Sequence, residues 1–195
     1  VQTCALPIWL AEALARGTVL PLWRGKPLMD GPRPGWVPAG HPVLALAGPA
    51  VFLGLDDGVA RFAADLSDWS PEAGADAPDA GFFDATVQRH PALGGGAGFV
   101  ELRGVMTQLT PREAELVATA KALLQWHRSH GFCSACGARS EMAVGGWQRS
   151  CPACAAQHFP RTDPVVIMLV THGNSVLLGR SPGWPEGMFS LLAGF

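Results

Sequence analysis

Apolar residues occur along the chain in short runs that turn-forming residues interrupt. Residues 43–47 and 50–55 are apolar over the length of a strand, and the Asp56-Asp57-Gly58 segment after them is typical of a tight hairpin turn. Apolar and polar positions then alternate over residues 59–63. We therefore predict strands at 43–47, 50–55 and 59–63, with the last two joined as a hairpin.

A longer amphipathic segment begins at Thr110. Thr110, Pro111 and Glu113 follow the pattern of a capping box with proline at the first helical position. Apolar positions then recur at helical spacing and share one face. The side chains on this face are Leu116, Ala120, Leu123, Leu124 and His127. Because Gly131 suits the position just after a helix end, the pattern predicts a helix over residues 111–130.

The remaining apolar segments are short. Residues 99–106 predict one strand, and residues 165–170 and 175–178 predict two more around a turn at 172–174. The cleanest apolar run, 165–170, has six residues, whereas a membrane-spanning helix needs about 20. The N-terminus also lacks the basic segment of a signal peptide. We therefore expect no membrane association and a cytoplasmic location.

Composition and charge narrow the class of protein. A length of 195 residues fits one to two domains, and 48% apolar with 15% charged residues is enough to form a core. A net charge of −2 excludes a strongly basic nucleic-acid-binding surface over the whole chain. The 24 glycines and 17 prolines predict many turns and short strands.

Both ends of the chain are unusual. Residues 1–8 resemble the in-frame translation of a sequencing-library adaptor, so we exclude them from the fold prediction. The chain starts with Val1 and stops at Phe195 within an apolar segment, which we interpret as two cut ends. Residues 70–81, rich in proline, alanine, glycine and aspartate, are predicted to be a linker or an exposed loop.

Four of the five cysteines form two C-x-x-C pairs. Cys133 and Cys136 make the first pair, and Cys151 and Cys154 make the second after a gap of fourteen residues. This spacing matches a tetrahedral Cys4 zinc site, in which each tight turn presents two thiolates to the ion. Because four protein ligands leave no open coordination position, we predict one structural Zn²⁺ per chain.

Two alternatives use the same cysteines. A pair of disulfides needs an oxidising compartment, and the chain carries no secretory signal. A thioredoxin-like redox motif needs a single C-x-x-C in a βαβ unit. The nearby His127 and His130 are interpreted as helix-end and packing residues, because four cysteines already complete a zinc site, and His158 is interpreted as a surface residue.

The segments around the cysteines resemble a known family. Residues 124–133 read Leu-Gln-Trp-His-Arg-Ser-His-Gly-Phe-Cys, residues 158–170 begin His-Phe-Pro-Arg-Thr-Asp-Pro, and residues 187–195 read Gly-Met-Phe-Ser-Leu-Leu-Ala-Gly-Phe. These motifs are similar to those of the NADH pyrophosphatase (NAD diphosphatase) branch of the Nudix hydrolases. The resemblance is strong over residues 99–195 and looser over 36–98.

The resemblance implies an activity. Family members hydrolyse NADH or NAD⁺ to nicotinamide mononucleotide and AMP with Mg²⁺ or Mn²⁺, tend to be homodimers, and can remove NAD caps from RNA. Their catalytic glutamates follow the first glycine of the Nudix box, which Gly194 resembles, so these glutamates would lie beyond Phe195. We therefore expect the parent protein to be an enzyme and the present chain alone to be inactive.

The resemblance also implies roles for particular residues. Arg103 matches a substrate-contacting arginine, and Phe159 matches an aromatic substrate contact. Phe195 resembles the aromatic residue that stacks on the nicotinamide, and the backbone carbonyl of Ala193 matches a ligand of the catalytic metal. Gly146 stands where a relative can carry a substrate-contacting glutamate, so this chain departs from the pattern there.

These observations predict an α+β fold in three parts. They are a mixed N-terminal domain over residues 9–125, a Cys4 zinc ribbon over 126–160, and the first strands of an incomplete Nudix α/β/α sandwich over 161–195. The alternative function is a non-enzymatic zinc-ribbon module that binds nucleic acid or protein. The residues that would supply positive charge for it are Arg128, Arg139, Arg149 and Arg161. The lack of a continuous basic face and the Leu-Ala-Gly-Phe segment count against this alternative.

Overall fold

The computed structural model describes residues 5–71 and 84–194. Phe195 and most of the predicted linker at 70–81 lie outside the described residues, so the predictions for them stay predictions. The same holds for the first part of the adaptor-like segment at 1–8.

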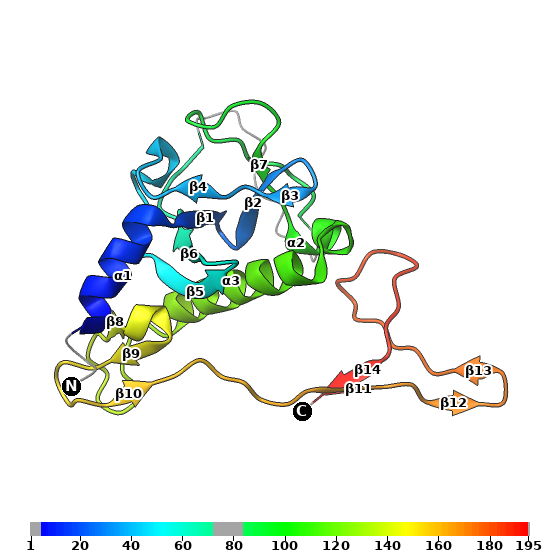
Figure 1. The fold of residues 1–195 in the computed structure, drawn as a ribbon. Coiled ribbons are helices and arrows are strands. Elements are labelled where there is room, and N and C mark those ends of the chain that lie inside the picture. Colours follow the sequence, from blue (N-terminus) through cyan, green and yellow to red (C-terminus); the bar gives the residue numbers. More distant parts are fainter. Residues whose placement is uncertain (1–4, 72–83, 195) are drawn as a thin grey trace. The chain divides into compact units, whose positions relative to one another are not determined.

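The described chain divides into two compact units (Figure 1). The first contains residues 5–71 and 85–160, and the second contains Asp84 with residues 161–194. The first unit holds the N-terminal sheet, its helices and both cysteine pairs. Among the described residues, no helix combines the length and apolar character that a membrane span requires.

The first unit is built on a seven-stranded mixed sheet. Its main order is β3-β2-β1-β6-β5, with β4 paired to β1 and β7 paired to β2. All neighbours are antiparallel except β1 and β6, which run parallel. The strands are β1 (Thr18–Trp23), β2 (Lys26–Asp30), β3 (Arg33–Pro34), β4 (Val37–Pro38), β5 (Val51–Asp56), β6 (Val59–Asp65) and β7 (Gly98–Phe99).

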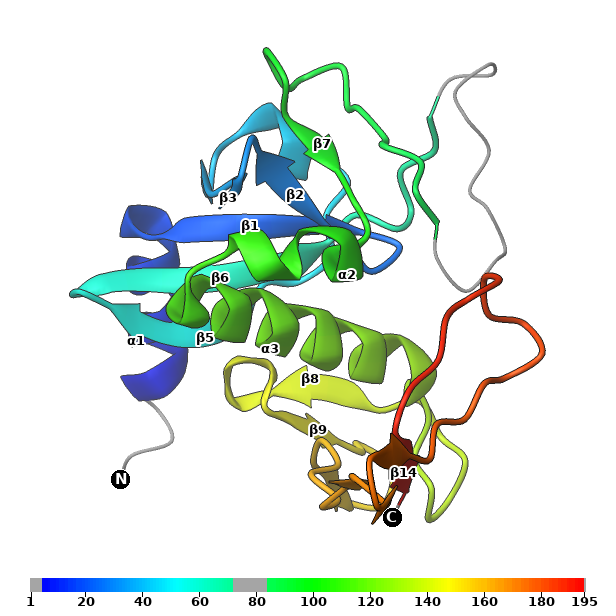
Figure 2. The same ribbon diagram turned by 90° about the vertical axis from the view of Figure 1, so that its right-hand side faces the viewer.

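Both faces of this sheet are covered. Along β1, Val19 and Trp23 join one core cluster, which includes side chains of helix α1 (Ala5–Arg16), while Leu20 and Leu22 join the other. The second cluster includes helix α3 (Pro111–Ser129), which runs across the sheet face (Figure 2). Successive residues of β1 point to opposite faces of the sheet, and both faces are buried. The sequence of β1 is therefore a continuous apolar run.

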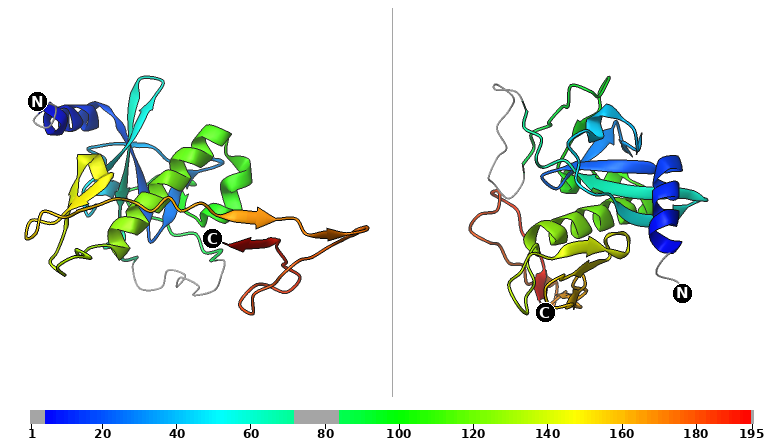
Figure 3. Two further views of the ribbon diagram at one scale, coloured as in Figure 1. Left: turned by 90° about the horizontal axis from the view of Figure 1, so that it is seen from below. Right: turned by 90° about the vertical axis from the view of Figure 1, so that its left-hand side faces the viewer.

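The first turns of α1 come from the adaptor-like segment. Residues 5–8 begin this helix, and farther along it Leu10 and Leu14 pack against the core cluster. In Figure 3, α1 crosses one end of the sheet, next to β1 and β6.

The predicted hairpin at residues 50–63 is confirmed as β5 and β6. Asp56 pairs with Val59, and the two turn residues Asp57 and Gly58 have φ values of 50° and 81°. Both values lie in the left-handed region that the tightest hairpin turn requires, which aspartate tolerates and glycine adopts freely. Asp56 accepts hydrogen bonds from Arg61, so a charge pair fixes the hairpin end.

Two predicted strands are wrong. Residues 43–47 contain part of the 3₁₀ helix η1 (Pro42–Leu44) instead, because Pro42 starts a helical turn and His41 Nδ1 accepts a hydrogen bond from the Val43 N–H. Of the predicted strand at 99–106, only the start is β7.

The rest of that predicted strand forms helix α2 (Leu102–Val105) and the 3₁₀ helix η2 (Met106–Gln108). Leu102, Val105 and Leu109 all pack into the second core cluster. Their spacing of three and four residues has the period of a helix, and burial against the sheet decides the conformation.

The predicted helix at 111–130 is confirmed as α3. Its capping box is complete: Glu113 N–H donates to Thr110 Oγ1 at 3.3 Å, and Thr110 N–H donates to Glu113 Oε2 at 2.9 Å. The helix ends at Ser129, with Gly131 after the cap residue. The buried side chains are Val117, Ala120, Leu123, Leu124 and Trp126. The buried face thus overlaps the predicted one, with Leu116 only half-buried.

Replacing the cap residue should weaken this helix measurably. Thr110→Ala removes a hydrogen-bond acceptor for an otherwise unpaired helical N–H, so we expect the free energy of unfolding to fall by about 1 kcal/mol in urea titration. Thr107→Ala, at an exposed position of η2, is the matched control and should change it by less than about 0.5 kcal/mol. Equal effects of the two variants would contradict the assigned cap.

His90 is packed against the aromatic part of the first core cluster. Its ring centroid lies 4.7 Å from that of Trp69, and its Nδ1 accepts a hydrogen bond from the Ala92 N–H at 3.1 Å. Burial, and after it repulsion from His41, lowers the pKa of His90 below its usual 6.5. The unfolded chain therefore binds a proton at a higher pH than the folded chain.

This difference gives stability a pH dependence. Above about pH 6.5, His90 is neutral in both the folded and the unfolded chain, so its contribution to the free energy of unfolding does not change with pH. As the pH falls from there toward the folded pKa of His90, only the unfolded chain takes up the proton, and this contribution is lost progressively. His90→Asn keeps an acceptor near the Ala92 N–H but does not titrate, so the loss of unfolding free energy between pH 7.5 and 5.5 should shrink. His172→Asn, at an exposed position, is the control, and identical pH profiles for the two variants would refute this assignment.

The cysteine region forms a three-stranded antiparallel sheet that follows α3. Its order is β10-β9-β8, as expected for a small β ribbon. The elements are β8 (Glu141–Ala143), the 3₁₀ helix η3 (Val144–Gly146), β9 (Gln148–Ser150) and β10 (Gln157–His158). Met142 of β8 packs against the core cluster under α3, and β8 runs below that helix in Figure 2.

The second unit consists of two strand pairs. β11 (Val166–Met168) pairs with β14 (Leu192–Gly194), and β12 (Thr171–His172) pairs with β13 (Ser175–Val176). The predicted turn at 172–174 is therefore confirmed, whereas the predicted strands at 165–170 and 175–178 form only in part, as β11 and β13. The class predicted from the sequence, α+β with a small cysteine ribbon, is confirmed.

Candidate functional site

The two cysteine pairs lie in two similar turns. Cys133 and Cys136 follow α3, and Cys151 and Cys154 lie between β9 and β10. In each turn the first cysteine makes two backbone hydrogen bonds. The bonds are Cys133 N to Ala138 O at 2.8 Å, Gly137 N to Cys133 O at 2.9 Å, Cys151 N to Ala156 O at 2.9 Å and Ala155 N to Cys151 O at 2.9 Å. This repeated turn aims both sulfurs of each pair to the same side.

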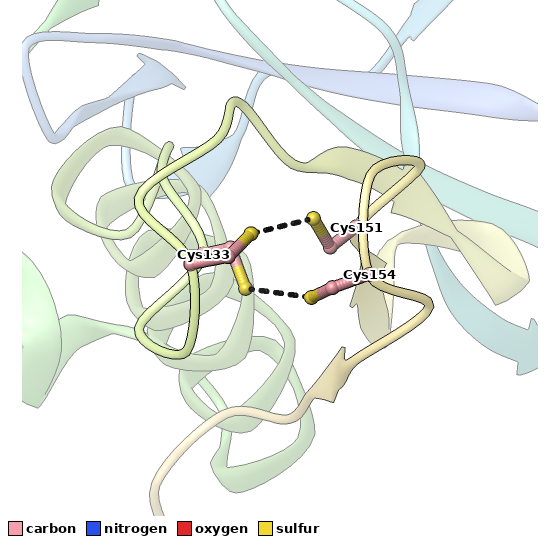
Figure 4. Close-up of side chains that lie close together, drawn as sticks. Cys133, Cys151 and Cys154 are labelled. Atoms are coloured by element: carbon pink, nitrogen blue, oxygen red, sulfur yellow. Dashed lines mark hydrogen bonds between the residues drawn. The ribbon is translucent and has the colours of Figure 1, made fainter.

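The four sulfurs converge on one point (Figure 4). All four Sγ atoms lie within 4.8 Å of one another, with 3.6 Å between Cys133 and Cys154 and 3.5 Å between Cys136 and Cys151. A zinc ion with Zn–S bonds of about 2.3 Å gives a tetrahedron with edges of about 3.8 Å. The residues therefore fit zinc in position and in chemistry, and all four thiols are free of disulfides.

The electrostatics of the cluster call for a cation. Burial raises the pKa of Cys133, but hydrogen bonds from the backbone N–H groups of its turn, from His158 and from Cys154 outweigh burial and lower it to about 6. A backbone hydrogen bond with Ala156 lowers the pKa of Cys154, yet the three neighbouring sulfurs raise it to about 12. Four thiolates at this distance are therefore stable together only with a positive ion among them.

His158 contacts the cluster directly. Its Nε2 lies 3.3 Å from Cys133 Sγ, and its side chain is half-buried. Such a contact orients a metal-binding sulfur and adjusts its charge. His158 is therefore not the surface residue that the sequence predicts, and its position four residues after Cys154 is the only sequence signal that points to this contact.

A buried arginine joins the ribbon to the end of α3. Arg149 donates to Ser140 Oγ at 2.8 Å and to His127 Nδ1 at 3.0 Å, and His127 Nε2 lies 2.8 Å from Gly146 O. Because arginine keeps its protons, Nδ1 accepts and Nε2–H donates, so His127 is neutral. Burial lowers the pKa of His127 first, Gly146 O raises it, and Arg149 lowers it further. His127 is thus a packing residue, in line with the sequence interpretation.

The ribbon also closes against the edge strand β5. Trp147 Nε1–H donates to Phe52 O at 2.6 Å, which covers a carbonyl at the sheet edge. Gly146 has φ of 94°, and a Cβ there would lie 2.8 Å from the Val51 methyl groups. This position has no room for a substrate-contacting glutamate pointing to solvent.

The implied substrate residues of the first unit lie apart. Arg103 is in α2, which leads through η2 into the N-terminal end of α3, whereas Phe159 follows β10 in the ribbon beyond the other end (Figure 1). The 19 residues of α3 span about 28 Å. Both side chains are exposed. The structure therefore does not bring these two residues together within one copy of this unit.

Ala193 belongs to β14 of the second unit. It pairs in register with Ile167 and lines a cavity of about 450 Å³ together with Arg180 and Trp184. Arg180 donates a hydrogen bond to Trp184 O at 2.6 Å, which holds the loop around this cavity.

The arginines that favoured a nucleic-acid-binding module are mostly engaged within the protein. Arg149 is buried in the network with His127, and Arg139 lies over the Phe132 ring at 5.7 Å. Arg161 pairs with Asp163 in the second unit. These contacts weaken the alternative function.

Comparison with known proteins agrees with this arrangement. Residues 16–126 match the model of the NADH pyrophosphatase-like rudimentary NUDIX domain, and residues 128–159 match that of the NADH pyrophosphatase zinc ribbon domain. The chain is 45% identical over 97 residues to the human mitochondrial NAD(P)H pyrophosphatase NUDT13, covering 50% of this chain and 28% of that protein.

Bacterial relatives give the same result. The chain is 40% identical over 105 residues to the NAD-capped RNA hydrolase NudC of Stutzerimonas stutzeri, covering 54% of this chain and 38% of that protein. It is 44% identical over 97 residues to NudC of Mycobacterium tuberculosis, covering 49% and 31%. The matched segment thus spans well under half of the length of these curated relatives. Since the first family model alone covers more than half of the chain, the chain belongs to the NADH pyrophosphatase family of zinc-ribbon Nudix proteins.

Proposed function

We propose that this chain belongs to an NAD(H) diphosphatase, which hydrolyses the pyrophosphate of NADH or NAD⁺ to nicotinamide mononucleotide and AMP. The observation that carries the proposal is the direct succession of the rudimentary NUDIX domain and the zinc ribbon, followed by the His-Phe-Pro-Arg-Thr-Asp-Pro segment. Because relatives are named NAD-capped RNA hydrolases, we extend the proposal to NAD caps on RNA.

Two kinds of metal serve this function. The four ribbon cysteines hold a structural Zn²⁺, which fixes the ribbon against β5 and the end of α3. Mg²⁺ or Mn²⁺ in the catalytic centre would neutralise the phosphate oxygens and activate water. The backbone carbonyl of Ala193 would supply one oxygen ligand to that ion, in keeping with the preference of hard cations for oxygen.

The substrate contacts have separate roles. The planar guanidinium of Arg103 suits a phosphate, and the aromatic rings of Phe159, which is exposed, and of Phe195 suit stacking on the substrate's rings. We also propose that the whole protein is a homodimer.

The 195 residues alone are expected to be inactive. No two of their glutamates are three or four residues apart in the sequence, which is the spacing that places carboxylates on one helix face to hold the catalytic cations. Among the described residues, the one cluster suited to a metal is the four cysteines.

Sequencing the gene past codon 195 and assaying its product test the proposal. We expect a glutamate six positions after Gly194, then an Arg-Glu pair and a Glu-Glu pair, and a product that converts NADH to nicotinamide mononucleotide and AMP with Mg²⁺ or Mn²⁺. Residues 1–195 serve as the control without turnover. A continuation without these carboxylates would refute the proposed activity, and turnover by residues 1–195 would refute their proposed inactivity.

A further inference from the structure

The four ribbon cysteines differ in their exposure to solvent. Cys133 and Cys151 are buried, with exposed fractions of 3% and 2%, whereas Cys136 and Cys154 are exposed. The short sulfur–sulfur distances join unlike members, 3.6 Å from Cys133 to Cys154 and 3.5 Å from Cys136 to Cys151. The sulfur of each exposed cysteine therefore lies beside the sulfur of a buried cysteine from the other turn (Figure 4).

This arrangement has the two parts that a thiol oxidation site needs. An accessible thiolate attacks an oxygen of a hydroperoxide, breaks its O–O bond and becomes a sulfenic acid, and a neighbouring thiolate then displaces the hydroxyl to form a disulfide. The exposed Cys136 and Cys154 can meet the oxidant, and the buried Cys151 and Cys133 lie close enough to resolve the sulfenic acids.

We propose that the ribbon is a site of reversible oxidation by hydroperoxides, in which Cys154 pairs with Cys133 and Cys136 pairs with Cys151. For each pair, two thiolates, one hydrogen peroxide and two protons give one disulfide and two waters. The two electrons pass from the sulfurs to the peroxide O–O bond, which breaks. The proposal rests on zinc ligation by the same cysteines, so complete oxidation consumes two peroxides and removes all four ligands.

The pairing decides what happens to the ribbon. Both disulfides join the turn after α3 to the turn between β9 and β10, so they hold the two turns together as the metal did. The contact of Trp147 with β5 and the Arg149 network lie outside the sulfur cluster and persist. Oxidation therefore releases zinc without unfolding the ribbon, and reduction restores the ligands.

The test uses the whole chain with the single substitution Cys4→Ser at position 4. This substitution removes the fifth cysteine of the sequence and leaves the four ribbon cysteines unchanged. Zinc content is measured first, and a value near one per chain confirms the ligation on which the proposal rests. The protein is then titrated with hydrogen peroxide while a chromogenic chelator reports released zinc. We expect complete release at about two peroxides per chain, a mass loss of roughly 4 Da, and peptides joined 133–154 and 136–151.

A trapping experiment tests the order of events. Dimedone present during oxidation should label Cys136 and Cys154 in preference to the buried Cys133 and Cys151, and dithiothreitol with zinc should restore the zinc content. Disulfides within the pairs, 133–136 and 151–154, would overturn the proposal, as would zinc retained in excess peroxide or labelling mainly at the buried sulfurs. A chain that binds no zinc before oxidation would instead refute the ligation, independently of the disulfide pattern.

Discussion

Cys133→Ser is expected to abolish zinc binding and to unfold the ribbon while the N-terminal sheet stays folded. The ribbon strands have only two or three residues each, so backbone pairing alone does not stabilise them. Structural zinc contributes apparent binding free energies of about 10–16 kcal/mol in comparable peptides, which is far more than such strands provide. Loss of one thiolate also leaves only three sulfur ligands, so the tetrahedral coordination of zinc is incomplete.

Metal analysis and hydrogen exchange measure this effect. Zinc content should fall from one per chain to near zero, and the backbone amides at positions 133 and 151 should lose their protection from exchange. Amides of β1 and β6, which lie between the two core clusters, should keep theirs. Ser134→Ala, at an exposed position of the same turn, is the matched control. Full zinc content and unchanged protection in Cys133→Ser would show that the four cysteines do not form one closed site.

The features that the sequence predicted correctly are those with local causes. The α3 capping box lies within four residues, and the β5–β6 hairpin depends on a two-residue turn. The cysteine cluster is similar, because each C-x-x-C turn aims its own two sulfurs and only the meeting of two turns is non-local.

The failures come from tertiary packing. The segment at 99–106 contains enough apolar residues for a strand, but burial of Leu102 and Val105 beneath the sheet selects a helix. At 43–47, one proline and one histidine cap outweigh the apolar composition.

In the candidate site, too, the features with local causes could be predicted and those that depend on tertiary contacts could not. The metal ligands could be found from spacing, whereas the contacts that support them span long stretches of sequence. Trp147 and Phe52 are 95 residues apart, and Arg149 and His127 are 22 apart. A single sequence gives no sign of these pairs. Arg103, Phe159 and Ala193 came from family resemblance alone.

Gly146 is the position in the contact between the ribbon and strand β5 that least tolerates an added side chain. Its φ of 94° costs a residue with a Cβ about 1–2 kcal/mol, and that Cβ would lie 2.8 Å from two methyl carbons of Val51. Val51 is fully buried, so its side chain has no free space into which to move. Overpacking of this kind costs about 1–3 kcal/mol more. Gly146→Ala should therefore lower the free energy of unfolding by about 2–5 kcal/mol.

Gly137 provides the matched comparison, because its φ is 75° and a Cβ there meets no atom within 4 Å. Gly137→Ala should show the backbone cost alone, about 1–2 kcal/mol. In urea unfolding of the zinc-loaded chain, the difference between the two variants measures how tightly the ribbon is pressed onto β5. A double variant with Val51→Ala should recover part of the Gly146→Ala loss, because it removes the two methyl groups that clash. If both glycine variants lose the same stability, the close approach of ribbon and sheet at this point is wrong, and the ribbon is held by its zinc and by Arg149 instead.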